Sequence, residues 1–193
     1  MRITALFFAM LTLLGCSKPG WHMTDISGAM PRLDFHMTAN GKPVTAADLK
    51  GKVVALYFGY THCPDVCPTT LANLTDMMAK VGNPDVRVLF VTVDPDRDTD
   101  AVLADYAKAF SPQVVGLRGT ANQLAALART YRVAYTVKPG PPYEVMHSNA
   151  VFFFDRNGRA HISCNATSRS SIASRRAGMS PAANGTSANL WPD

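Results

Sequence analysis

Two cysteines and one distant histidine are the residues whose types and positions could do chemistry in this chain. Cys63 and Cys67 are separated by three residues and directly follow an unbroken apolar run, residues 53–58. Thiolates are soft metal ligands and nucleophiles, and a rigid strand can present a pair of them to a partner. His147 lies far along the chain and could supply a third soft ligand if the fold brings it close. The predicted chemistry is therefore copper binding or sulfur exchange.

The elements around the cysteines are predicted from apolar patterns. Residues 53–58 are all apolar, which is typical of a parallel strand buried on both faces. A helix should follow the cysteines, with a spaced apolar face made of Leu71, Leu74, Met78 and Val81. Pro68 suits its first position and Gly82 its end, so Cys67 is the expected N-cap residue. The positive potential of a helix N-terminus then predicts a lowered pKa for the Cys67 thiol.

The remaining chain continues the alternation of strands and helices. Thr99 can cap a second helix, with an apolar face of Val102, Leu103, Tyr106 and Phe110, and Thr120 with Gln123 forms a capping box ahead of a third. Strands are expected at residues 86–93, 114–117, 150–154 and 160–162, a Pro/Gly-rich loop at 133–145, and an N-terminal hairpin at 33–37 and 42–45. This order predicts a thioredoxin-like α/β fold, with a central mixed sheet flanked by helices.

Charge gives little support for nucleic-acid binding. The 193 residues include 19 Lys and Arg against 14 Asp and Glu, a formal charge of +5. More than half of this excess lies outside residues 17–160, and no basic stripe interleaved with aromatic residues occurs within them. We therefore expect no nucleic-acid partner.

The first residues resemble a bacterial lipoprotein signal peptide. Arg2 gives a positive start, the apolar stretch that follows is too short to span a membrane, and residues 13–16 end in Gly15 and Cys16. We expect residues 1–16 to be a signal peptide with a lipobox, Cys16 to be lipidated, and residues 17–29 to form a tether. The domain would then sit at the periplasmic face of a bacterial membrane, although an ordinary cleaved signal remains the alternative.

Three motifs together resemble the Sco/SenC family. They are GYTHCPDVCP at residues 59–68, VDPDRDT at 93–99, and HS at 147–148 ahead of VFFFD at 151–155. The resemblance implies a thioredoxin-like domain over residues 30–163, and a copper metallochaperone rather than an enzyme. It would deliver copper to the binuclear copper centre of cytochrome c oxidase. Its partners would be the copper-binding subunit of the oxidase and an upstream periplasmic copper donor.

The same resemblance implies roles for individual residues. One copper ion, Cu(I) or Cu(II), would be held by Cys63, Cys67 and His147, and the two cysteines could also form a redox-active disulfide. Two thiolates and one imidazole suit copper, whereas zinc normally takes four ligands. Outside the ligands, the expected supporting residues are Asp65, Asp94, Arg97 and Asp155.

The C-terminus departs from the family pattern. Residues 164–193 are rich in Ser, Ala, Asn, Gly and Arg and show no amphipathic period, where the family adds a strand segment and a closing helix. We hypothesise a reading-frame change near residues 160–164, and interpret Cys164 as a stray thiol in this atypical tail.

Other functions stay open at this point. A membrane-anchored thiol-disulfide reductase acting on the oxidase copper-site cysteines would use the same fold and thiols. The three-residue spacer and His147 argue against a general oxidoreductase, which has two intervening residues and a cis-proline before the equivalent strand. A peroxiredoxin fits less well, because Thr61 is one residue out of register with Cys63. A passive lipoprotein that binds only a partner protein would hold no metal.

Overall fold

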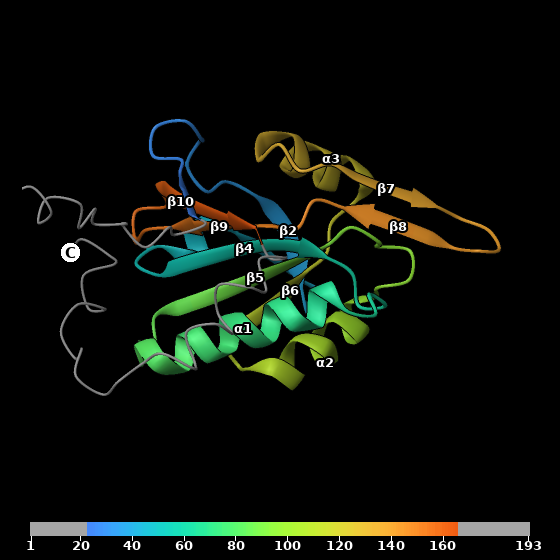
Figure 1. The fold of residues 1–193 in the computed structure, drawn as a ribbon, viewed down its shortest axis with the longest axis horizontal. Coiled ribbons are helices and arrows are strands. Elements are labelled where there is room, and N and C mark those ends of the chain that lie inside the picture. The colour runs from blue at the N-terminus through green and yellow to red at the C-terminus, as the bar shows by residue number, and fades with distance from the viewer. Residues whose placement is uncertain (1–22, 166–193) are drawn as a thin grey trace, which may run out of the picture.

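A computed structural model describes residues 23–165, which fold around a six-stranded sheet (Figure 1). In spatial order its strands are β1 (Met23–Asp25), β10 (Ala160–Asn165), β9 (Ala150–Phe154), β4 (Val53–Gly59), β5 (Val86–Thr92) and β6 (Val114–Leu117). Strands β4, β5 and β6 are parallel, whereas β9, β10 and β1 continue the sheet in antiparallel pairings. All seven residues of β4 are buried, so this strand is a rigid base for the loop that follows it.

Helices cover both faces of the sheet (Figure 1). Helices α1 (Val66–Val81) and α2 (Asp100–Phe110) pack on one face, and α3 (Ala121–Thr130) packs on the other together with strands β2 (His36–Ala39) and β3 (Lys42–Thr45). A 3-10 helix, η1 (Ala46–Leu49), follows β3. Side chains of β4 alternate between the two cores: Tyr57 faces α1, whereas Leu56 and Phe58 face α3. The predicted mixed sheet, flanking helices and N-terminal hairpin are all present.

The predicted helix ends are confirmed by their hydrogen bonds. Thr99 accepts a bond from the amide of Val102 at 3.3 Å. The capping box forms as expected, because the Gln123 side chain accepts from the Thr120 amide at 2.8 Å and the Gln123 amide donates to the Thr120 hydroxyl at 3.3 Å. Gly82 ends α1 with a φ of 64°, a left-handed conformation that favours glycine.

The segment predicted as a loop over residues 133–145 instead contains strands. Strands β7 (Tyr135–Lys138) and β8 (Glu144–His147) form a hairpin, and the Pro/Gly-rich residues make only its turn. In Figure 1 this hairpin extends beyond the main sheet. Its side chains alternate between exposed and half-buried positions, so no apolar run marked either strand in the sequence.

Smaller differences concern the bounds of other elements. The first strand of the N-terminal hairpin begins at His36 rather than at residue 33. Strand β1 was not predicted, and its partner β10 continues to Asn165, so Cys164 belongs to the sheet and is half-buried there. Val102 is 40% exposed and does not belong to the apolar face of α2.

The predicted signal peptide, Cys16, residues 17–22 of the predicted tether and the tail beyond residue 165 lie outside the described residues. Within residues 23–165, no helix has both the length and the apolar character needed to cross a membrane.

Candidate metal centre

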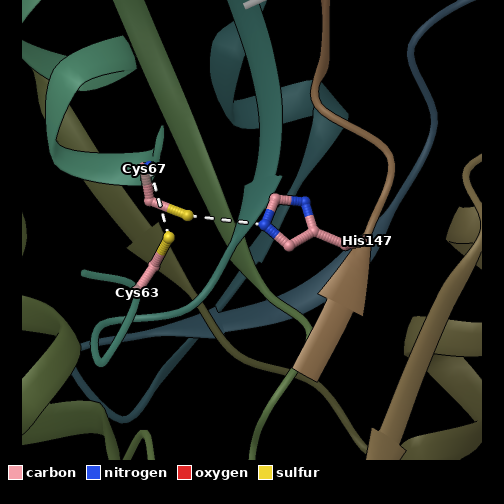
Figure 2. Close-up of side chains that lie close together, drawn as sticks. All are labelled: Cys63, Cys67 and His147. Carbon is pink, nitrogen blue, oxygen red and sulfur yellow. Dashed lines mark hydrogen bonds between the residues drawn. The ribbon is translucent and has the colours of Figure 1, made fainter. Parts of the chain in front are cut away.

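The fold brings Cys63, Cys67 and His147 together at the carboxyl end of β4. Cys63 lies in the loop after β4, Cys67 in the first turn of α1, and His147 is the last residue of β8 (Figure 2). Their two sulfur atoms and an imidazole nitrogen all lie within 4.8 Å of one another. The Cys67 Sγ is 3.4 Å from the Nε2 of His147. Within the described part of the chain, this is the group of Cys, His and carboxylate side chains arranged to hold a metal ion.

The two thiols have different surroundings, and the pKa prediction for Cys67 is wrong. Helix α1 starts at Val66 with Asp65 as its N-cap, so Cys67 lies inside the helix and is fully buried. Burial raises the pKa of Cys67 to about 12. Burial also raises the pKa of Cys63, but the amides of Cys67, Asp65 and Val66 donate toward its sulfur and lower the pKa overall. The helix N-terminus therefore stabilises the thiolate of Cys63, which lies in the loop that leads into the helix.

His147 presents a nitrogen lone pair toward the thiols. Its Nδ1 lies 2.8 Å from the carbonyl oxygen of Ser148, which can only accept, so Nδ1 carries the proton and Nε2 is free to bind a metal. Burial lowers the pKa of His147, and its bond to Ser148 opposes this only in part. The neutral imidazole is therefore favoured near neutral pH. The rings of Tyr60 and Tyr57 pack edge-on against it, with centroids 5.9 and 6.2 Å away.

Gly59, the last residue of β4, packs closely against the site. A Cβ atom at this position would lie 2.5 Å from Cε2 of Phe90 and 3.0 Å from the sulfur of Cys67. Real Cβ atoms essentially never approach other atoms as closely as 2.5 Å. Glycine at this position is what allows both the Phe90 ring and the Cys67 sulfur to pack directly against the end of β4.

Asp94 and Arg97 pair beside the site and hold the hairpin that carries His147. Asp94 is 1% exposed and accepts from Nε of Arg97 at 2.5 Å and from the hydroxyl of Tyr143 at 2.8 Å. The guanidinium of Arg97 stacks on the Tyr143 ring, 3.8 Å from its centroid, and lies 5.9 Å from that of Tyr60. Tyr143 immediately precedes β8. These contacts connect the loop after β5 to the strand that ends in His147.

Asp65 and Asp155, the other two residues expected to support the site, differ in position. Asp65 caps α1 next to the cysteines and accepts from the Thr69 hydroxyl at 3.4 Å. Asp155 follows β9, and because Phe154 pairs with Val54 at the start of β4, it lies at the opposite end of β4 from Cys63. There it accepts from the amides of Asn157 and Arg159 and from His161, as expected for a residue that shapes a turn. The structure does not bring Asp155 to the thiols.

Asp98 supports the cysteine loop and was not singled out for this role. It is fully buried and accepts from the amide and hydroxyl of Thr61, at 3.0 and 2.6 Å, and from the hydroxyl of Thr92 at 2.6 Å. His62 is exposed, and its Nδ1 lies 3.5 Å from the same carboxylate. The sequence signal was the acidic run at residues 94–100, of which Asp94 and Asp98 are the buried members.

The fold and the site define a class of protein: a thioredoxin-like domain with two thiols after a core strand and an imidazole from a projecting hairpin. The family model described as SCO1/SenC matches residues 30–177. The chain therefore belongs to the SCO1/SenC family, as the three motifs indicated. The matched region continues past residue 163, the predicted end of the domain.

Named relatives and solved structures agree with this assignment. The chain is 43% identical over 125 residues to the Bos taurus mitochondrial SCO2 homolog, covering 61% of this chain and 47% of that protein. It spans about half the length of the curated relatives it matches. Among solved structures, Bradyrhizobium japonicum ScoI with copper bound is 34% identical with a TM-score of 0.65, covering 77% of this chain and 99% of that one. Arabidopsis thaliana ScoI with copper bound is 36% identical with a TM-score of 0.63, covering 67% and 84%.

Proposed function

We propose that this protein binds one copper ion through the sulfurs of Cys63 and Cys67 and the Nε2 of His147. The observation that carries the proposal is the convergence of these three atoms within 4.8 Å, although His147 is 80 residues from Cys67. Two thiolates and a neutral imidazole form a soft donor set that suits Cu(I) and accepts Cu(II) with a further ligand. Relatives of the same fold hold copper, which supports the choice of metal.

The bound copper is a cargo, and we propose that it is delivered to the copper-binding subunit of cytochrome c oxidase. Three protein ligands leave a coordination position open, through which an acceptor can share the ion before taking it. Cys63 is only half-buried, so the site has an accessible side. An upstream periplasmic donor would load the site from there. This role is that of a metallochaperone and needs no enzymatic turnover.

We further propose that the domain works at a membrane surface through lipidation of Cys16, at the periplasmic face. A structurally similar SCO1/SenC family lipoprotein from Bacillus anthracis, 25% identical with a TM-score of 0.64, supports the membrane association. Mass spectrometry of the mature N-terminus tests this proposal directly. A diacylated Cys16 is the expected result, and a mature terminus elsewhere would contradict it.

A copper titration of the reduced protein tests the metal proposal. We expect one Cu(I) per chain for the wild type, and loss of high-affinity binding in Cys63→Ser, Cys67→Ser and His147→Ala. Cys164→Ser is the matched control, because Cys164 is also a half-buried thiol but lies outside the cluster. Full binding by the His147 variant, or loss of binding by the Cys164 variant, would contradict the assigned ligands.

Thiol-disulfide exchange with the oxidase copper-site cysteines is the second candidate function. It is favoured by the unequal thiols, because a nucleophilic Cys63 beside a buried Cys67 suits disulfide exchange. A disulfide switch identified in BsSco, 25% identical with a TM-score of 0.57, adds support from the family. Restoration of oxidase assembly by His147→Ala in a cell lacking the protein would favour this second function, and failure to restore it would favour copper delivery.

We also propose that Asp94 and Arg97 act on the copper site by positioning His147. Both ends of β8 are tied down: Tyr143 binds Asp94 and Arg97 at one end, and the Ser148 amide donates to the Ala134 carbonyl at 2.8 Å at the other. Asp65 would act more locally, because it begins the helix that carries Cys67 and its backbone amide donates toward the Cys63 sulfur.

A further inference from the structure

A buried phenol without a hydrogen bond lies beside the two thiols. Tyr57 is on β4, two residues before Gly59, and is 0% exposed. Within residues 23–165 its hydroxyl has no hydrogen-bond partner. A buried polar group without a hydrogen bond lowers the stability of the folded state. Such groups are rare in native proteins, and their presence often has a functional reason.

The Tyr57 side chain lies beside two of the three candidate metal ligands. Tyr57 packs in the same buried cluster as Cys67, close to the side chain of Thr70, and its ring lies edge-on against His147 with the centroids 6.2 Å apart. The Thr70 hydroxyl donates its own proton to the carbonyl of Val66 at 2.7 Å, so it has none to give to Tyr57. The phenol proton therefore has two neighbouring acceptors, the Thr70 oxygen and the Cys67 sulfur, and it bonds to neither in the metal-free geometry.

We propose that the Tyr57 hydroxyl is held as a hydrogen-bond donor for the sulfur of Cys67 in the copper-loaded protein. This inference rests on the proposed copper site. A neutral thiol is a weak acceptor, whereas a metal-bound thiolate carries negative charge and accepts a strong bond. Tyr57 would thus be a positioning residue: it binds no metal itself, but stabilises the charged form of the ligand buried most deeply.

Such a bond has consequences for both states of the protein. In the loaded state it stabilises the negative charge of the ligating sulfur, as hydrogen bonds to ligating cysteines do when they tune a metal site. In the empty state the hydroxyl is left unpaired, which disfavours that state relative to the loaded one. Both effects favour retention of copper, and the second predicts that the metal-free protein gains nothing from this hydroxyl.

The test compares Tyr57→Phe with the wild type in three measurements. Competition with a chromophoric Cu(I) chelator should show about tenfold to hundredfold weaker binding, the range expected for loss of a hydrogen bond to a charged group. The sulfur-to-Cu(II) charge-transfer band should move to lower energy, because the sulfur electrons are no longer stabilised. The melting temperature of the metal-free protein should stay the same or rise.

Tyr106→Phe is the matched control. The Tyr106 hydroxyl is also buried and has no hydrogen-bond partner among the described residues, and its ring centroid lies 5.5 Å from that of Phe90 in the same core. Burial raises the pKa of Tyr106, and the two cysteines raise it further through their charge but not through a hydrogen bond. We expect the same stability effect in the metal-free protein, with copper affinity and spectrum unchanged.

The possible outcomes separate this inference from the proposed function. Wild-type affinity and spectrum in Tyr57→Phe, an equal copper defect in Tyr106→Phe, or a clear fall in the melting temperature of metal-free Tyr57→Phe would each overturn the role of Tyr57 alone. Absence of Cu(I) binding by the wild type would overturn the copper site itself, and the role of Tyr57 with it.

Discussion

Replacement of Gly59 by alanine tests the packing that places the Cys67 sulfur. The new methyl group would lie 2.5 Å from Cε2 of Phe90 and 3.0 Å from the sulfur of Cys67. Both of these side chains are 0% exposed, so neither can move into solvent. Overpacking a well-packed core costs about 1–3 kcal/mol, and we expect the free energy of unfolding of Gly59→Ala to fall by that amount.

The same change should weaken the metal site. The Phe90 ring packs against Tyr57 and Tyr106, with centroid distances of 6.0 and 5.5 Å, so it has little room to withdraw. To make room for the new methyl group, we therefore expect the Cys67 sulfur to shift as well. Metal–ligand distances tolerate shifts of only about 0.2 Å, and disturbing the groups that orient a ligand typically lowers metal affinity by about 10–100-fold. We expect a loss in that range for Cu(I).

Urea denaturation of the metal-free protein and chelator competition for Cu(I) measure the two effects. Gly116→Ala is the control. Gly116 lies in β6, and its Cβ would meet the carbonyl oxygen of Leu103 in α2 at 2.9 Å, on the same face of the sheet as the Gly59 contacts but away from the thiols. It should lose stability without losing copper affinity. Wild-type stability and affinity in Gly59→Ala, or an equal copper defect in Gly116→Ala, would refute the packing argument.

Three further predictions concern other parts of the structure. Tyr143→Phe keeps the ring but loses the bond to Asp94, so Cu(II) electron paramagnetic resonance should show weaker imidazole coupling, and an unchanged spectrum would contradict the positioning proposal. Thr120→Ala removes a helix cap and should lower the free energy of unfolding in urea by about 1 kcal/mol with no change in Cu(I) affinity; a copper defect would contradict this separation. The pKa of Asp85 is lowered to about 2 by its lysine and arginine partners, so its contribution to stability is present above about pH 4 and is lost toward pH 2; the difference in urea midpoint between the wild type and Asp85→Asn should shrink over that interval.

Much of the fold could be predicted because its signals are local. The continuous apolar run of β4 predicts a strand buried on both faces, and Thr99, Thr120 and Gly82 mark helix ends through bonds or backbone angles that involve only nearby residues. The positions of Cys63 and Cys67 follow from the same pattern, because a strand and a helix on either side fix the loop between them.

The parts that could not be predicted depend on contacts between distant residues. The β7–β8 hairpin has half-buried alternating side chains and takes its place through Tyr143, whose partner Asp94 is 49 residues away. The opposite pKa shifts of the two thiols depend on which sulfur enters the core and which receives the amides of α1. The role of Tyr57 depends on a missing hydrogen bond, which no sequence pattern records.

The state of His147 bears on the choice between the two candidate functions. Both use the unequal thiols: an accessible Cys63 exchanges with a partner while Cys67 remains buried. Disulfide exchange, however, has no need for a buried neutral imidazole with its Nδ1 proton fixed and its Nε2 lone pair 3.4 Å from a sulfur. A soft metal ion does need such a ligand, because imidazole binds metals in its neutral form. The position and protonation of His147 therefore favour copper delivery over thiol exchange alone.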